Sequence, residues 1–274
     1  MWRVLHFVLS MAAVSVLGVL LITQAPGVGI DERELSGQPS AATLERIKQE
    51  RAGDASFLRL YAKWAGGLLR GDLGHSEALN RPVTELLRER IPVTARVAVP
   101  GLLVAWLGGL ALALAAVAGP AWLRWLPVPL SGALACIPAA VAAFAVAWSG
   151  GPAFLAIGFA VLPKIFSYTE ALMRREFARP ARLMALARGL SPGRVLLHYV
   201  LRPAGPELLA LAGASVPLAI GAAIPVEVFS DTAGIGQLAW KAASARDVFP
   251  LVNLTLLITG ITLLVSGGGE RRHA

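Results

Sequence analysis

Long apolar runs constrain the fold of this chain more than any other feature of its sequence. Hydrophobic residues make up 56% of its 274 residues, and charged residues make up only 15%. A helix needs roughly 20 apolar residues to cross about 30 Å of hydrocarbon. Six runs come near this length: Val4–Thr23, Val93–Ala118, Leu126–Trp148, Phe154–Leu172, Leu208–Phe229 and Val248–Ser266. We therefore expect an all-α integral membrane protein with six transmembrane helices.

The runs are continuous, whereas strands of a membrane β-barrel alternate apolar and polar residues. The first run has an alternative explanation as a cleaved signal peptide, because Arg3 precedes it and Thr23-Gln24-Ala25 has the small residues of a cleavage site. It is longer than the roughly 7–15 residues of a signal-peptide core. We therefore expect the first run to be a retained helix.

Arginine is concentrated between the fourth and fifth runs, at Arg174, Arg175, Arg179, Arg182, Arg188, Arg194 and Arg202. Such segments stay on the cytoplasmic side of a membrane, and six spans then place both termini there as well. The long region between the first two runs would be external, because long loops translocate largely regardless of charge. The net charge of +8 is thus explained by topology, and no nucleic-acid partner is expected.

The arginine-rich segment also has the pattern of two short helices at 180–206. Gly189 can adopt the left-handed conformation that ends a helix, and Ser191-Pro192 is a typical helix start. Leucine and valine give the second helix an apolar face that could pack on a partner. From composition alone, an ordinary arginine-bearing cytoplasmic loop explains the segment equally well.

Residues 185–191, Ala-Leu-Ala-Arg-Gly-Leu-Ser, resemble the cytoplasmic coupling loop, or EAA loop, of the membrane subunits of binding-protein-dependent ABC importers. The dipeptide/oligopeptide/nickel permease branch typically has Ala-Arg-Ala-Lys-Gly-Leu-Ser there. The Glu-Ala-Ala that names the loop is Leu183-Met184-Ala185 in this chain, so only the last alanine is kept. Three further segments resemble the same branch in the same order: 61–74, 81–94 and 225–238, the last with Ala245-Arg246-Asp247 behind it.

This resemblance implies the type I ABC importer permease fold with a cytoplasmic coupling-helix hairpin. An N-terminal transmembrane helix (1–23) would precede an external loop with an amphipathic helix (24–92) and a permease core (93–274), whose coupling loop spans about 173–207. The implied partners are a second permease subunit in a heterodimer, two ABC ATPase subunits, an external substrate-binding protein and membrane lipid. The implied location is the cytoplasmic membrane of a bacterium or archaeon.

Two sets of candidate site residues follow from the resemblance. The ATPase-coupling set is Arg182, Ala185, Arg188, Gly189, Ser191 and Arg194. The set for the translocation pathway or its gate is Glu227, Phe229, Gly234 and Gly236. An acid near the end of a span usually faces a cavity or partner, although a position at the lipid headgroups is the alternative for Glu227. The two glycines would permit a tight loop, and simple turn geometry explains them equally well.

Sequence patterns of catalysis are missing. None of the four lysines follows glycine and precedes serine or threonine as in a phosphate-binding loop, and HExxH does not occur. The single cysteine, Cys136, excludes an intramolecular disulfide and a cysteine zinc cluster. We expect no catalytic, cofactor-binding or metal-binding residues, with ATP hydrolysis in the partner subunits.

The expected function is a permease subunit that forms the pathway for a small solute, with a di- or oligopeptide preferred to nickel or a related chelate. An ion-coupled secondary transporter is one alternative. It would carry polar residues in several spans, and often an inverted repeat, and neither is evident. A non-transporting membrane scaffold derived from a permease is the other, and its support is the short connection at 148–152 between the third and fourth runs.

Overall fold

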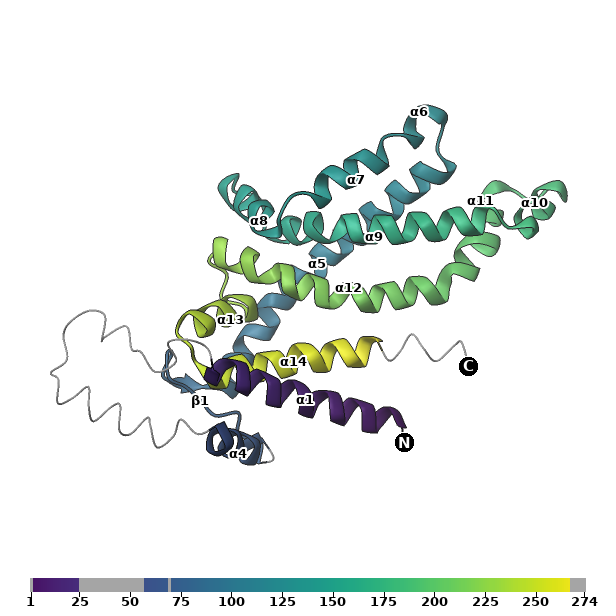
Figure 1. Cartoon of the computed structure of the whole chain (residues 1–274). Helices are drawn as coiled ribbons and strands as arrows, with labels where there is room; N and C mark the ends of the chain where they lie inside the picture. The colour runs from purple at the N-terminus through teal and green to yellow at the C-terminus, as the bar shows by residue number, and fades with distance from the viewer. Residues whose placement is uncertain (1, 25–56, 69, 267–274) are drawn as a thin grey trace, which may run out of the picture. The chain divides into compact units, whose positions relative to one another are not determined.

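The computed structural model describes residues 2–24, 57–68 and 70–266 (Figure 1). The polar segment Asp31–Asp54 of the expected external loop lies outside the described residues. The chain divides into two compact units. One comprises Met1–Glu89 with Leu238–Gly260, and the other comprises Arg90–Gln237 with Ile261–Ala274. We call them the first and second unit and describe each by itself.

Four of the described helical segments are long and apolar enough to cross a membrane: α5 (Val83–Ala118), α9 (Phe154–Phe177), the run Pro192–Phe229 that ends with α12 (Arg202–Phe229), and α14 (Val248–Ser266). Helix α1 (Trp2–Gln24) contains a shorter apolar stretch, Leu5–Leu20. The expected helical membrane fold is confirmed. The expected count of six uninterrupted spans is not.

The span expected at Leu126–Trp148 is not one continuous helix, although its two halves together still qualify as one bent candidate span. After the short helix α6 (Ala121–Arg124), this stretch forms α7 (Pro127–Ala135) and α8 (Ala139–Trp148), and the chain bends by 93° between them (Figure 1). Pro138 occupies the N-cap of α8 with an extended ψ of 142°. Proline has no N–H and disfavours helical geometry in the residue before it, so the apolar run breaks here.

The second unit is built around α9, which packs against α7, α8 and α12. Its core consists mainly of alanine, valine and isoleucine, with Ile157 and Ile165 fully buried. Glycines let α5 approach α9 closely, since a Cβ at Gly101 would lie 2.8 Å from the Phe154 carbonyl oxygen and one at Gly109 would lie 2.8 Å from Ile165. Small residues at helix contacts are typical of membrane helix packing.

The first unit contains α1, α4 (Phe57–Leu68) and a small antiparallel hairpin of β1 (His75–Ser76) and β2 (Arg81–Pro82), in which His75 is opposite Pro82. An amphipathic helix was expected within 24–92, and α4 is a helix of that region. Its Trp64 is buried in a cluster with Val19, Val252 and Leu256. The hairpin was not expected.

The second span was expected to begin at Val93, and α5, the helix that contains it, begins earlier, at Val83. Residues 83–92 are too polar to be recognised as part of an apolar run. They are nevertheless continuous with the apolar part of α5. Pro92 removes only one backbone hydrogen bond, and a long helix tolerates that loss.

Candidate functional site

The expected coupling hairpin forms a helix–turn–helix at one end of α9 (Figure 1). Helix α10 (Pro180–Ala187) ends at Gly189, which has a φ of +76°, and α11 (Pro192–Val195) follows. The Gly189 N–H donates to the Leu186 carbonyl (2.9 Å), and the Leu190 N–H donates to the Ala185 carbonyl (3.3 Å). These two bonds make a Schellman motif, which favours glycine at this position. The left-handed turn expected at Gly189 is confirmed.

The fifth span was expected at Leu208–Phe229, after the hairpin, and the helix that contains it begins earlier, inside the hairpin. A π-helical turn at Leu196–Leu201 joins α11 to α12, so the chain is helical from Pro192 to Phe229. Pro203 cannot donate to the carbonyl one turn before it, and its ring would clash there. The wider π-helical turn before Pro203 accommodates the ring without ending the helix.

The candidate coupling residues differ in their exposure. Arg188, Gly189, Ser191 and Arg194 are exposed, whereas Ala185 is buried. Arg182 turns back towards α9, where its guanidinium lies 4.6 Å from the centroid of the Phe177 ring and donates to the Phe177 carbonyl. Leu183 and Met184 are exposed apolar residues of α10. The hairpin therefore exposes two arginines, Arg188 and Arg194, and two apolar side chains, while Arg182 joins α10 to the end of α9.

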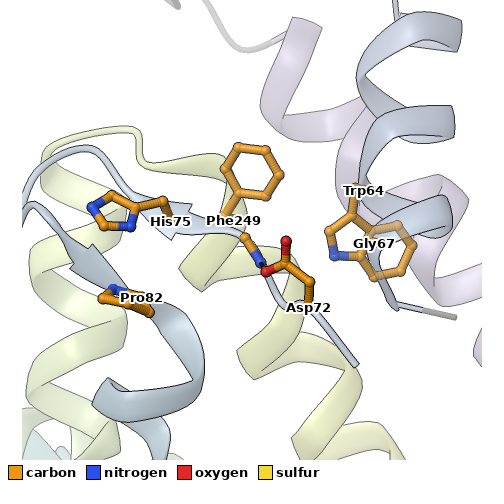
Figure 2. A pocket seen from close by; sticks show the side chains of 7 residues that line it. Trp64, Gly67, Asp72, His75, Pro82 and Phe249 are labelled. Carbon is orange, nitrogen blue, oxygen red and sulfur yellow. Dashed lines mark hydrogen bonds between the residues drawn. The ribbon is translucent and has the colours of Figure 1, made fainter. Parts of the chain in front are cut away.

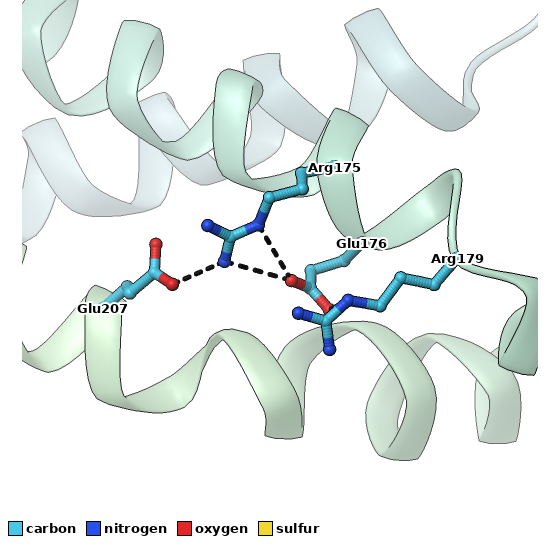
Figure 3. Close-up of polar contacts among 4 residues, drawn as sticks. All are labelled: Arg175, Glu176, Arg179 and Glu207. Carbon is cyan, nitrogen blue, oxygen red and sulfur yellow. Dashed lines mark hydrogen bonds and ion pairs between the residues drawn. The ribbon is translucent and has the colours of Figure 1, made fainter. Parts of the chain in front are cut away.

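Four charged side chains form a network at the base of the hairpin (Figure 3). Glu176 has no exposed surface, and its carboxylate pairs with Arg175 at 3.2 Å and with Arg179 at 3.0 Å. Arg175 also bonds to Glu207 of α12 at 2.5 Å. From the sequence, these arginines indicate only the topology. Nothing in the local sequence shows that Glu207 would face Arg175.

Glu227 of the second candidate set is completely buried near the end of α12. One carboxylate oxygen accepts a hydrogen bond from the Thr94 hydroxyl (2.5 Å). The other accepts from the backbone N–H groups of Gly236 (2.7 Å) and Gln237 (3.0 Å). The Thr94 oxygen in turn accepts from the Ile235 N–H (2.8 Å). Together the two side chains satisfy the first N–H groups of α13 (Ile235–Ser244).

The two candidate glycines are required for space rather than for turn geometry, because neither has a positive φ. A Cβ at Gly236 would lie 2.7 Å from the Ile224 Cα of α12, and a Cβ at Gly234 would collide with the Glu227 carboxylate. Phe229 lies apart from this cluster. It is 47% exposed, and its ring stands edge-on to Phe144 at 5.8 Å.

Three residues of the Glu227 cluster were missed by sequence analysis: Thr94, Gln237 and Arg90. Arg90 donates to the Gln237 side chain (3.3 Å) and to the Gly234 carbonyl (3.4 Å). Gln237 also donates to Asp231 (2.9 Å). Thr94 lies 133 positions from Glu227 in the sequence, and no local pattern distinguishes its hydroxyl from others in the spans.

A cavity of about 360 Å³ opens in the first unit, lined by Trp64, Gly67, Asp72, Gly74, His75, Pro82 and Phe249 (Figure 2). Four of these lining residues belong to the segment 61–74, which resembles the permease branch. Asp72 accepts from the Gly74 N–H at 2.9 Å, and Asn253 donates to the Leu73 carbonyl at 2.8 Å. Residues 72–74, at the end of this segment, are thus held as a loop against the start of α14.

The strand hairpin beside this cavity is also held by polar contacts. The Ser76 hydroxyl donates to the buried Asp247 carboxylate at 2.6 Å. Arg81 makes a two-pronged contact with Glu89, and this hydrogen bonding raises the pKa of Arg81 above its ordinary value. Among the described residues, no three His, Cys, Asp or Glu side chains are placed to hold a metal ion.

The family of binding-protein-dependent transport system inner membrane components matches residues 107–268, which is more than half of the chain. The chain belongs to this family. The match includes the hairpin, its charged base and the Glu227 carboxylate. The protein is therefore a multi-pass membrane permease with the type I ABC importer fold, and the implied family is confirmed.

Several similar proteins align with nearly the whole permease. A probable peptide ABC transporter permease, y4tP of Sinorhizobium fredii, is 26% identical over 96% of this chain and 93% of its own length. A putative peptide transport system permease of Brucella abortus is 29% identical over 94% and 90%, respectively. The glutathione transport system permease GsiC of Escherichia coli is 24% identical over 96% and 92%.

Proposed function

We propose that this permease carries a peptide-like solute across a bacterial or archaeal cytoplasmic membrane and couples to an ATPase subunit through the hairpin at 180–206. The observation that carries the coupling proposal is the exposed surface of the hairpin around the Gly189 turn, which includes Arg188, Arg194, Leu183 and Met184. Support for a peptide-like solute comes from the relatives, which are named as peptide or glutathione permeases.

In this proposal the hairpin lies in a cleft of the ATPase subunit. The two apolar side chains provide burial, and the arginines orient the hairpin by charge. Closure of the ATPase dimer on ATP would move the hairpin, and with it α9 and α12, so that access to the pathway switches sides. ATP hydrolysis takes place in the partner subunits. A second permease subunit in a heterodimer and an external binding protein complete the importer.

The proposed orientation places the hairpin and both termini in the cytoplasm. The arginines between α9 and α12 support this direction, because positively charged segments are retained on the cytoplasmic side. The strand hairpin and the cavity near Trp64 would then lie on the external side, where the binding protein delivers solute.

We propose a gate role for the second candidate set. Glu227, Gly234 and Gly236 hold the first turn of α13 against α12, and the complete burial of Glu227 favours positioning over direct contact with solute. Phe229 is exposed at the end of α12 and is the member of the set that can face the pathway. Family membership favours this importer over an ion-coupled carrier. The same substitutions at the gate distinguish a permease from a scaffold. They should abolish transport by a permease, whereas a non-transporting scaffold would tolerate them.

Affinity purification of the tagged chain from its native host, followed by mass spectrometry, tests the coupling proposal. We expect an ABC ATPase and a second permease subunit to co-purify. Gly189→Val should weaken recovery of the ATPase, because valine is strained at a φ of +76°. Gly193→Val is the matched control, since Gly193 has ordinary helical geometry and open space around it. Recovery without any ATPase would contradict the proposal.

A further inference from the structure

We infer that the ion pair between Arg175 and Glu207 is a positioning tie that closes the base of the coupling hairpin, so that α9 and α12 move together when the hairpin moves. The inference rests on the proposed docking of the hairpin for its role in transport. The tie itself is a property of this chain alone.

The two residues occupy the points where the chain enters and leaves the hairpin. Arg175 lies in the last turn of α9, and Glu207 lies near the start of α12. Their side chains meet at 2.5 Å, so everything from 176 to 206 forms a loop closed by this contact (Figure 3). Force applied to the hairpin reaches the spans through these two helix ends.

Buried Glu176 fixes the Arg175 side chain in place. The Arg175 Nε and Nη2 atoms donate to one Glu176 oxygen at 3.3 and 3.2 Å, while Arg179 approaches the other oxygen at 3.0 Å. A carboxylate without exposed surface requires such partners, because burial of an uncompensated charge is strongly unfavourable. The guanidinium is therefore held by Glu176, and its Nη2 group, which carries two N–H donors, also donates to Glu207.

An exposed ion pair between two free side chains contributes little, because both lose conformational freedom when they meet. Here Arg175 is already ordered by Glu176, so its contact with Glu207 costs less conformational entropy. The apolar contacts between α9 and α12 are not directional and allow sliding. The ion pair joins one specific point of each helix and so sets their register.

A neighbouring pair provides a matched control. Arg174 bonds to Glu170 one turn earlier on α9, so this pair joins two residues of the same helix. Removing it deletes an arginine–glutamate contact close to the hairpin without disconnecting α9 from α12.

Pulsed electron paramagnetic resonance on the full chain in lipid nanodiscs tests the tie. In a Cys136→Ala background, spin labels at Ala178→Cys and Leu209→Cys, both exposed positions, report the separation of the two helix ends. We expect one narrow distance distribution in the parent and a broadened or shifted one in Glu207→Gln. Glu207→Asp, which keeps the charge, should restore the narrow distribution, and Glu170→Gln should leave it unchanged. An unaltered distribution in Glu207→Gln would overturn the inference.

The same labels in the complex purified with its ATPase separate the two proposals. Addition of ATP with vanadate should shift the distance in the parent, and Glu207→Gln should lose that defined shift. A complex that responds equally with and without the Glu207 charge would refute the tie and leave the docking proposal intact. Failure of any ATPase to co-purify with the parent would count against docking, while the nanodisc measurement still decides the tie.

Discussion

Replacement of Thr94 by valine tests whether the Glu227 cluster holds α13 in place. Valine has nearly the same shape as threonine, so the change removes a hydroxyl without opening a cavity. Two buried hydrogen bonds disappear: the one that Thr94 donates to Glu227 and the one that it accepts from the Ile235 N–H. The bonds from Gly236 and Gln237 to Glu227 remain.

The size of the effect follows from these two bonds. A hydrogen bond to a charged group contributes about 1.5–3 kcal/mol, and leaving a buried N–H without an acceptor costs about 1–3 kcal/mol. The sum is about 2.5–6 kcal/mol in the free energy of unfolding. For a chain of this size, each kcal/mol lowers the midpoint of thermal unfolding by about 2–4 °C, so we expect Thr94→Val to lower it by about 5–24 °C.

Thermal unfolding in detergent, followed by tryptophan fluorescence, measures this shift. Thr94→Ser keeps the hydroxyl and should retain most of the stability. Thr255→Val is the matched control, because the exposed Thr255 hydroxyl bonds only to the Leu251 carbonyl of its own helix. An unfolding midpoint in Thr94→Val equal to that of the parent would refute the reasoning that this cluster positions α13.

Two further predictions concern packing and orientation. Gly236→Ala places a methyl group against the α12 backbone and should cost about 1–3 kcal/mol of stability, whereas Gly221→Ala, which has open space on α12, should be neutral in the same unfolding assay. In a Cys136→Ala background, a membrane-impermeant maleimide applied to intact spheroplasts should label Glu77→Cys and leave Arg188→Cys unlabelled. The reverse labelling pattern would contradict the proposed topology.

The sequence predicted well those features that depend on local composition. The apolar runs located α5, α9, α12 and α14, and the glycine and proline pattern located the turn between α10 and α11. The signal was strong in both cases because the physical requirement is local. A span needs a long apolar run, and a left-handed helix end favours glycine.

Features that depend on the rest of the fold were not predictable in the same way. The apolar run at 126–148 is uniform in hydropathy, so hydropathy does not reveal its bend. The structure shows that the helix breaks at Pro138, which precedes α8. Thr94 and Glu207 have partners far away in the sequence, at Glu227 and Arg175. A hydroxyl or carboxylate acquires such a role only from the helix that is packed opposite to it.

Site-specific photo-cross-linking from the hairpin is the most direct test of the central claim that this surface docks on an ATPase. A photoreactive amino acid would replace exposed Met184 on α10, with a second variant carrying it at exposed Trp148 at the end of α8. Ultraviolet irradiation of membranes from the native host should cross-link the ATPase subunit from position 184 and not from position 148. Absence of the ATPase adduct from position 184, in a variant that still assembles with the second permease subunit, would contradict the account.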